Sequence, residues 1–248
     1  MNSCSVSIII ATYNSGKTLR AALRSVVEQI YQDWECIIVD GASSDDTLSI
    51  IEEYESLDNR IRHISEPDNG IYDAFNKGWK LANGEWIHYL GSDDKLTKDS
   101  FCEMMSSNNI EYSVISGAVF VEKIDGSIKL LKSCEWDGGH QGKLTRKKIL
   151  EKYGGFDEQF QIVADYDLYT RLKKSGEKIK NFGGVVAYFA STGISQSFKT
   201  FLKKQKEIRL VDKKNRNKRF FDRTIRWYKG LLSLIYRNMT KYINNIKD

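Results

Sequence analysis

Short apolar segments alternate with amphipathic ones through the first ninety residues, and this order restricts the fold more than any other feature of the chain. Residues 6–11, 34–39, 61–65 and 86–90 are short runs with the composition of buried strands. Between them, residues 19–30, 47–54 and 71–82 place apolar side chains three or four positions apart, as in helices with one buried face. A β-α-β-α-β-α-β order predicts an α/β fold with a parallel sheet and right-handed crossovers.

Polar residues follow these strands at the points where the strands end. Residues 12–14 follow the first strand, Asp40 ends the second, and Asp93 and Asp94 come after the fourth. The carboxyl ends of parallel strands share one edge of a sheet, and ligands of open α/β sheets bind outside that edge. We therefore expect these side chains to converge on a nucleotide-binding crevice.

Asp93 and Asp94 are adjacent carboxylates after an apolar strand, and two interpretations fit them. Oxygen ligands of this kind suit Mg²⁺ or Mn²⁺ held against a phosphate. The alternative is a structural one, in which the acids precede the helix that begins near Thr97.

The pattern changes after Asp94. Strand-like runs at 114–117, 118–123, 127–132, 178–182 and 185–189 are mixed with helical segments near 97–107 and 145–152 and from residue 164. Asp125-Gly126 is a hairpin signal. We expect one domain over residues 1–198, with a nucleotide-binding half at 1–94 and an acceptor half at 95–198, followed by a basic amphipathic helical tail at 199–248.

Charge is distributed unevenly between these parts. Residues 199–248 carry 16 Lys and Arg against 4 Asp and Glu, a net charge of +12, whereas residues 1–198 carry a net charge of −7. Basic residues beside Trp, Tyr and an apolar stripe suit a helix in an anionic membrane interface. Alternatives are a helix packed on the acidic domain, or a segment that binds nucleic acid; the acidic domain argues against nucleic acid as a partner.

Cysteine usage and the N-terminal residues bear on location. The four cysteines, at positions 4, 36, 102 and 134, are widely spaced and form no C-x-x-C pair. A zinc site or disulfide framework is therefore not expected, and reduced thiols fit the cytoplasm. With neither a signal peptide nor an apolar run of about 20 residues, we expect a cytoplasmic protein, or one peripheral to the inner face of the cell membrane.

Four motifs give the chain a specific resemblance. They are VSIIIATYN at 6–14, VDGASSDDT at 39–47, EPDNGIYDAFNKG at 66–78 and LGSDD at 90–94. In order and spacing they resemble the family 2 glycosyltransferases with the GT-A fold, in particular small bacterial enzymes of capsule, O-antigen and exopolysaccharide synthesis. The resemblance extends to about residue 195. It implies a Rossmann-like, mostly parallel sheet flanked by helices.

The resemblance also implies a nucleotide-sugar site in the first half of the chain. Asp40 would accept an N–H of the nucleobase, and Asp93 and Asp94 would hold Mn²⁺ or Mg²⁺ and the diphosphate. The family usually has Asp-x-Asp here, and Gly91 occupies the first position. The other expected nucleotide-sugar contacts are Thr12, Tyr13, Asn14, Asp68, Asn76, Lys77 and Ser92.

In the second half, the resemblance implies a general base. Asp165 is the predicted base, with Asp167 as its competitor two residues on. His140 and Gln141 are expected to contact the acceptor or the diphosphate.

The implied reaction is an inverting, metal-dependent transfer of a single sugar to a hydroxyl of a glycan or a polyprenyl-diphosphate-linked glycan. A UDP-sugar is the favoured donor and a GDP-sugar the alternative. The alternative functions are a sugar nucleotidyltransferase and a nucleic-acid-binding protein that acts through the basic tail.

Overall fold

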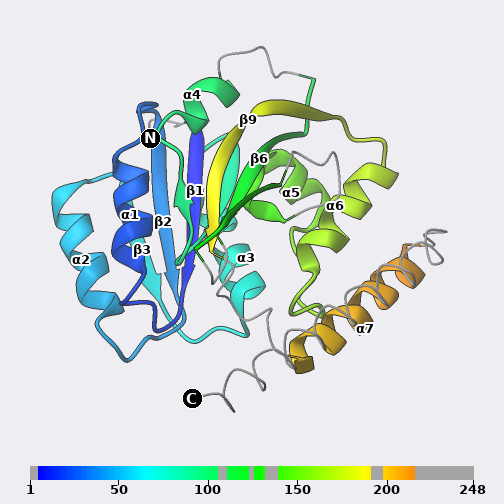
Figure 1. Ribbon diagram of the computed structural model, residues 1–248, viewed down its shortest axis with the longest axis horizontal. Helices are drawn as coiled ribbons and strands as arrows, with labels where there is room; N and C mark the ends of the chain where they lie inside the picture. The colour runs from blue at the N-terminus through cyan, green and yellow to red at the C-terminus, as the bar shows by residue number, and fades with distance from the viewer. Residues whose placement is uncertain (1–4, 106–110, 123–125, 132–138, 191–197, 216–248) are drawn as a thin grey trace. The chain divides into compact units, whose positions relative to one another are not determined.

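Four parallel strands form the first half of the sheet, as the alternation predicts. The computed structural model describes residues 5–105, 111–122, 126–131, 139–190 and 198–215. The strands lie in the order β3–β2–β1–β4 (Figure 1). Their register pairs Thr12 with Asp40 and Ala11 with Gly91, so the strand ends are level with one another. The bounds are β1 (Val6–Thr12), β2 (Trp34–Asp40), β3 (Ile61–Ser65) and β4 (Trp86–Gly91).

Helices cover both faces of this parallel part. Alternate β1 residues such as Ile8 share a core with the buried faces of α1 (Leu19–Val27) and α2 (Thr47–Leu57). On the opposite face, α3 (Ile71–Leu81) packs through Gly78, where any side chain would overlap Ile9. All seven residues of β1 are buried, as expected for a strand covered on both sides.

The second half extends the same sheet beyond β4 in the order β8–β6–β9–β5, with β7 paired to β6. Here β8 is antiparallel to both β4 and β6, whereas β6 and β9 are parallel. The strands are β5 (Lys95–Leu96), β6 (Val114–Glu122), β7 (Ile128–Leu131), β8 (Lys143–Arg146) and β9 (Ile179–Ala190). The helical elements are α4 (Ser100–Met105), η1 (His140–Gly142), α5 (Lys147–Tyr153) and α6 (Ala164–Lys174).

The sheet is parallel in its first half and mixed in its second, within the predicted α/β fold. The structure corrects the expected strands at two places. The runs at 178–182 and 185–189 form the single strand β9, because its ladder with β6 continues past the glycines at 183 and 184 with shifts in register. The runs at 114–117 and 118–123 are likewise the single strand β6.

The chain divides into two units, Met1–Gly193 and Ile194–Asp248. Within the second, residues Phe198–Lys214 form helix α7, in agreement with the expected helical tail. Residues 216–248, which carry most of its aromatic side chains, lie outside the described part of the chain. Among the described helices, none has the length and apolar character needed to span a bilayer.

Candidate active site

The turns after β1, β2 and β4 are joined by hydrogen bonds. Asn14, with a left-handed φ of 48°, accepts a hydrogen bond at Oδ1 from the Ser44 N–H at 2.9 Å. The Asn14 N–H donates to Ser43 Oγ at 2.8 Å. Ser15 Oγ lies 2.8 Å from Ser92 Oγ, which brings the turn after β4 into the same group. The predicted convergence of residues 12–14 and 92 with the end of β2 is therefore present.

Asp40 lies at the centre of this edge and is fully buried. Its Oδ1 accepts hydrogen bonds from Thr12 Oγ1 at 2.9 Å and from Ser43 Oγ at 2.5 Å. Its Oδ2 accepts from the Ser43 N–H at 2.9 Å and from Ser65 Oγ at 2.7 Å. Burial by itself would raise the pKa of Asp40, but these donors outweigh it and hold the pKa below the ordinary value.

Tyr13 and Asp68 meet above Gly41, the residue that follows Asp40. A Cβ on Gly41 would lie 2.6 Å from Asp68 Oδ2 and 3.4 Å from Tyr13 Cδ2. Tyr13 is 67% exposed, so its ring faces solvent at the sheet edge. Asp68 Oδ1 accepts a hydrogen bond from the Gly70 N–H at 2.8 Å. Tyr13 and Asp68, both predicted nucleotide-sugar contacts, thus lie on either side of the space above Gly41.

Asn76 and Lys77, the other predicted nucleotide contacts on α3, are held by protein partners. Asn76 is buried; its amide donates to Phe156 O and Glu158 Oε1, and its Oδ1 accepts from the Phe156 N–H and Trp79 Nε1. These four bonds use the full capacity of the amide, which is therefore a structural link.

Lys77 Nζ lies 2.9 Å from Glu66 Oε1, 3.0 Å from Pro67 O and 3.6 Å from Asp73 Oδ2. Hydrogen bonding to Glu66 raises its pKa above the ordinary value. These contacts fix the loop that carries Asp68.

Asp93 and Asp94 converge on Gly91. A Cβ at position 91 would lie 2.7 Å from Asp94 Oδ2 and 3.0 Å from Asp93 Oδ1. Asp94 is 1% exposed, and its Oδ1 accepts the Ala190 N–H at 2.9 Å. Burial raises the pKa of Asp93, and burial together with the charge of Asp93 raises the pKa of Asp94 to about 7. The space of the absent side chain at 91 is therefore filled by the two carboxylates.

The donor set of Asp93 and Asp94 fits a divalent cation. A buried carboxylate (Asp94) beside a partly buried one (Asp93) is costly to ionise, and a bound cation would offset that cost. Within the described residues, no group of three or more His, Cys, Asp or Glu side chains forms a metal cluster. The protein would thus supply these two carboxylates and leave the remaining positions to the diphosphate and water.

Asp165 and His140 form a pair on the second half of the sheet. Asp165, in the first turn of α6, places Oδ2 3.4 Å from His140 Nδ1 and accepts the Tyr166 N–H at Oδ1. Burial would raise the pKa of Asp165, but His140, this N–H and the ammonium of Lys143 lower it overall. The His140 ring packs 5.0 Å from that of Phe75, and its Nε2 is buried without a described partner.

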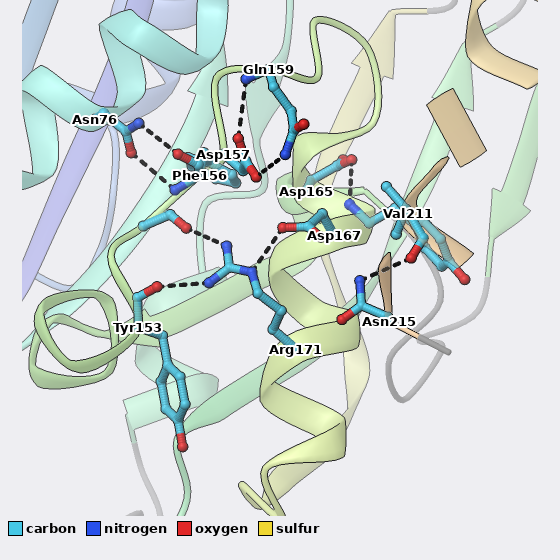
Figure 2. A network of polar contacts seen from close by, with 12 residues as sticks. Asn76, Tyr153, Phe156, Asp157, Gln159, Asp165, Asp167, Arg171, Val211 and Asn215 are labelled. Carbon is cyan, nitrogen blue, oxygen red and sulfur yellow. Dashed lines mark hydrogen bonds and ion pairs between the residues drawn. The ribbon is translucent and has the colours of Figure 1, made fainter. Parts of the chain in front are cut away.

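Asp167 points into a different network, which Figure 2 shows. It is fully buried and accepts a hydrogen bond from Arg171 Nε at 2.7 Å. The same guanidinium donates to Tyr153 O at 2.7 Å and to Gly155 O at 2.6 Å (Figure 2). Asp167 therefore orients a structural arginine, and of the two carboxylates Asp165 is the one beside His140.

The loop between α5 and α6 is held from both sides. From α3, Asn76 bonds to Phe156, and Tyr72 Oη donates to Ile162 O at 3.0 Å. From α6, Arg171 holds the turn at Gly155. The start of α6, and with it Asp165, is thus tied to the helix that packs under the nucleotide edge.

Sequence reasoning missed strand β8 and its residue Lys143. Lys143 is only 3% exposed, donates to Gly139 O at 2.7 Å and lies 4.6 Å above the Tyr169 ring. It therefore fixes the residue before His140. Gln141, the other predicted residue here, folds its side-chain amide over Gly139. In sequence, the basic residues around Leu144 resemble the start of the helix that follows. The segment Lys143–Arg146 is a strand because it pairs with β4 and β6.

Comparisons with known proteins agree with this geometry. Residues 7–167 match the family Glycosyl transferase family 2. The PGL/p-HBAD biosynthesis glycosyltransferase of Mycobacterium tuberculosis is 29% identical over 216 residues, which cover 80% of this chain and 82% of that protein.

Two solved structures share the fold. Staphylococcus aureus TarS, solved with UDP-GlcNAc, aligns over 84% of this chain with a TM-score of 0.67 and 19% identity. The mannosyltransferase PcManGT of Pyrobaculum calidifontis, solved with GDP-Man and Mn²⁺, aligns over 82% with a TM-score of 0.66 and 16% identity. The chain spans 65% and 61% of these two chains.

A match over residues 7–167 takes in the nucleotide edge, the acid pair and the start of α6. The fold common to TarS and PcManGT is the GT-A fold, a sheet flanked by helices. The chain belongs to glycosyl transferase family 2 and is a glycosyltransferase.

Proposed function

We propose that the protein transfers one sugar from a nucleoside diphosphate sugar to an acceptor hydroxyl with inversion at the anomeric carbon. The acceptor oxygen bonds to that carbon as its bond to the diphosphate oxygen breaks. The bonding pair leaves with the diphosphate, and the acceptor proton passes to a base. The observation that carries the proposal is the pairing of the ionised, partly buried Asp165 of α6 with His140, in a fold whose strand ends carry Asp40 and the acid pair.

Asp165 is the proposed base. Its lowered pKa keeps the carboxylate ionised at neutral pH, so that it can accept a proton. His140 is proposed to orient it through Nδ1, 3.4 Å from Asp165 Oδ2, and this contact favours a role beside the base over a role as a diphosphate ligand. Asp167 is bound to Arg171 and takes no part in the transfer.

The donor diphosphate is proposed to lie at the end of β4. Asp93 and Asp94 would hold Mn²⁺ or Mg²⁺ there, and the ion would stabilise the negative charge of the leaving diphosphate. Asp40, Thr12 and Asn14 shape the adjoining nucleotide pocket through their bonds with the β2 turn. Membership of glycosyl transferase family 2 favours transfer of the sugar over transfer of a nucleotidyl group.

The acceptor is proposed to be a glycan or a lipid-linked glycan of a bacterial surface polysaccharide or glycoconjugate. Support comes from the mycobacterial relative, named for PGL/p-HBAD biosynthesis, and from the chondroitin synthase of Escherichia coli, 30% identical over 69% of this chain. The bound UDP-GlcNAc of TarS and GDP-Man of PcManGT support a UDP- or GDP-sugar as donor.

A panel of nucleotide sugars with Mn²⁺ or Mg²⁺, read by released nucleoside diphosphate, tests the reaction. With the active donor, Asp165→Asn should lower kcat roughly 10²- to 10⁴-fold, because the acceptor proton has no base. Binding of the nucleoside diphosphate should be retained, since Asp165 lies on the acceptor half. Glu151→Gln, an exposed acid on α5, is the matched control and should keep normal turnover.

Two results would contradict this assignment. Near-normal turnover of Asp165→Asn would remove Asp165 as the base. Full activity in EDTA, with no response to added Mn²⁺ or Mg²⁺, would remove the metal from the mechanism. Product analysis by NMR of the new anomeric bond reports inversion directly.

The basic tail is proposed to bind the anionic inner face of the cell membrane. Its net charge of +12 over residues 199–248 supports an electrostatic attraction to acidic lipids. The full chain should sediment with liposomes that contain phosphatidylglycerol and be released by salt, and a chain ending at residue 198 should not sediment. Equal recovery with neutral phosphatidylcholine liposomes would exclude the charge-based attachment.

A further inference from the structure

The two ring nitrogens of His140 have different surroundings. Nδ1 lies 3.4 Å from Asp165 Oδ2. The pKa of Asp165 is lowered, and an ionised carboxylate only accepts hydrogen bonds, so Nδ1 carries the proton in this contact. In a neutral imidazole the other nitrogen, Nε2, is then an acceptor and requires an O–H or N–H donor.

The donor that Nε2 requires must come from inside the protein. His140 is 6% exposed, and its Nε2 is buried with no hydrogen-bond partner among the described residues. Because this atom is closed off from solvent, a substrate bound at the surface does not reach it. A buried polar atom without a hydrogen bond is costly, so a donor near the ring is expected.

Tyr89 of β4 has the matching group. Three other buried side-chain atoms lack a partner within the described ranges: Trp34 Nε1, His88 Nε2 and Tyr89 Oη. The Tyr89 ring contacts the His140 ring, with centroids 6.3 Å apart and planes at 90°. Trp34 begins β2, and His88, on the opposite face of β4, packs against Phe101. Tyr89 is therefore the donor best placed for Nε2.

The two rings lie in apolar surroundings. The Phe75 ring of α3 lies 4.7 Å from the Tyr89 ring and 5.0 Å from the His140 ring. Phe156 lies 4.9 Å from the Tyr89 ring. Burial raises the pKa of Tyr89, so its hydroxyl keeps the proton and remains a donor at neutral pH. One donor and one acceptor that both lack partners form a site for a single bridging water.

We propose that the Tyr89 hydroxyl donates to His140 Nε2 through one buried water and so holds His140 in the tautomer whose Nδ1–H supports Asp165. Tyr89 is then a positioning residue that acts through His140. The proposal rests on the function proposed above, in which Asp165 is the base. Since β4 ends at Gly91, beside the acid pair, the same strand would align the diphosphate site and the base.

Nitrogen-15 NMR of the histidine rings measures the tautomer in the full chain without substrate. The chain has three histidines, and the His140 signals can be assigned by their loss in His140→Gln. Wild type should show a neutral His140 ring with its proton on Nδ1. Tyr89→Phe keeps the ring and removes the donor, so the form protonated at Nε2 should appear. Tyr153→Phe, which removes a hydroxyl bonded to Glu177, is the control and should leave the signals unchanged.

Kinetics with the active donor and acceptor measure whether this contact serves the base. Tyr89→Phe should lower kcat roughly 3- to 10-fold, the effect of one neutral hydrogen bond, with KM for the donor unchanged. In a His140→Gln background the same substitution should lower kcat by less than about twofold, because Tyr89 acts through His140.

Three results separate this inference from its alternatives. An unchanged tautomer in Tyr89→Phe, or a wild-type ring protonated at Nε2, would overturn it. Equal loss of kcat on Tyr89→Phe with and without His140 would also overturn it, since that result indicates a general packing role. Near-normal turnover of Asp165→Asn together with the expected tautomer change would instead contradict the base assignment and uphold the contact between Tyr89 and His140.

Discussion

The buried carboxyl of Asp94 should make the free energy of unfolding depend on pH, and this can be tested. Asp94 is 1% exposed, its pKa is raised to about 7, and its Oδ1 accepts a hydrogen bond from the Ala190 N–H. Asp94→Asn removes the charge while the amide oxygen can still accept that N–H. We expect this variant to be more stable than wild type at pH 8 in EDTA, and the difference in stability to be smaller at pH 5.

The sign and size of this stability difference between wild type and Asp94→Asn follow from proton linkage. An acid whose pKa is raised on folding binds more protons in the folded state, so stability falls as pH rises between the unfolded and folded pKa values. For Asp94 that window runs from its ordinary value of 3.8 to about 7. Between pH 5 and pH 8 wild type should lose roughly 2.5 kcal/mol that the asparagine variant does not lose.

Urea denaturation of both proteins in EDTA at pH 5, 6, 7 and 8 measures this difference. Titrating groups distant from Asp94 cancel because they are common to the two chains, whereas Asp93 is electrostatically coupled to Asp94 and contributes to the difference. Glu52→Gln serves as the control, an exposed acid whose removal should leave the pH dependence of wild type intact. Added Mn²⁺ at pH 8 should stabilise wild type more than Asp94→Asn. Equal dependence of stability on pH for wild type and Asp94→Asn would show that ionisation of Asp94 does not destabilise the folded state.

Two further predictions concern the contacts that hold the loop before α6. Arg171→Met leaves Asp167 buried without its cation and should lower the free energy of unfolding by about 3–5 kcal/mol, whereas Arg24→Met, at an exposed pair, should change it little. In Gly155→Ala the backbone φ stays at 66° and the new Cβ lies only 2.6 Å from Asn76 Oδ1 and from Trp79 Nε1 of α3. The free energy of unfolding should therefore fall by about 2–3 kcal/mol. Gly176→Ala has a similar φ but open space, so it should cost only about 1–2 kcal/mol. Equal unfolding midpoints within either pair of variants would contradict the corresponding contact.

The parallel half of the sheet could be predicted because the local pattern of apolar and polar residues indicates which side chains are buried. Strand β1 is apolar throughout and is covered on both faces, and the helices between the strands show one buried stripe each. The confirmed strand ends follow directly, since parallel strands in register must finish at one edge. The same argument places Asp40 and the acid pair at this edge.

The second half could not be predicted to the same depth because its strands depend on distant partners. Strand β8 has only four residues, two of them with long basic side chains that are buried by contacts with other elements. Sequence spacing also could not separate Asp165 from Asp167. That distinction requires the positions of His140 and Arg171, which lie on different elements.

A sequence also does not show whether a polar side chain already has hydrogen-bond partners within the folded protein. The resemblance predicts that Asn76 approaches the nucleotide, but its four partners include three from residues 156–158, some eighty positions away. It also predicts that Asp40 reads the base; the structure adds that Asp40 accepts hydrogen bonds from Thr12, Ser43 and Ser65, and its role toward the base stays a prediction. Only the folded chain shows which protein groups a polar side chain contacts.

The space at Gly91 has a consequence for how this motif can change over generations. A substitution that introduces an aspartate at position 91 would place its Cβ 2.7 Å from Asp94 Oδ2 and 3.0 Å from Asp93 Oδ1. Both carboxylates would have to shift to admit it, and a shift of Asp94 would disturb its bond to the Ala190 N–H. The effect of an acid at position 91 therefore depends on which residues occupy positions 93 and 94, so these positions are expected to change together rather than independently.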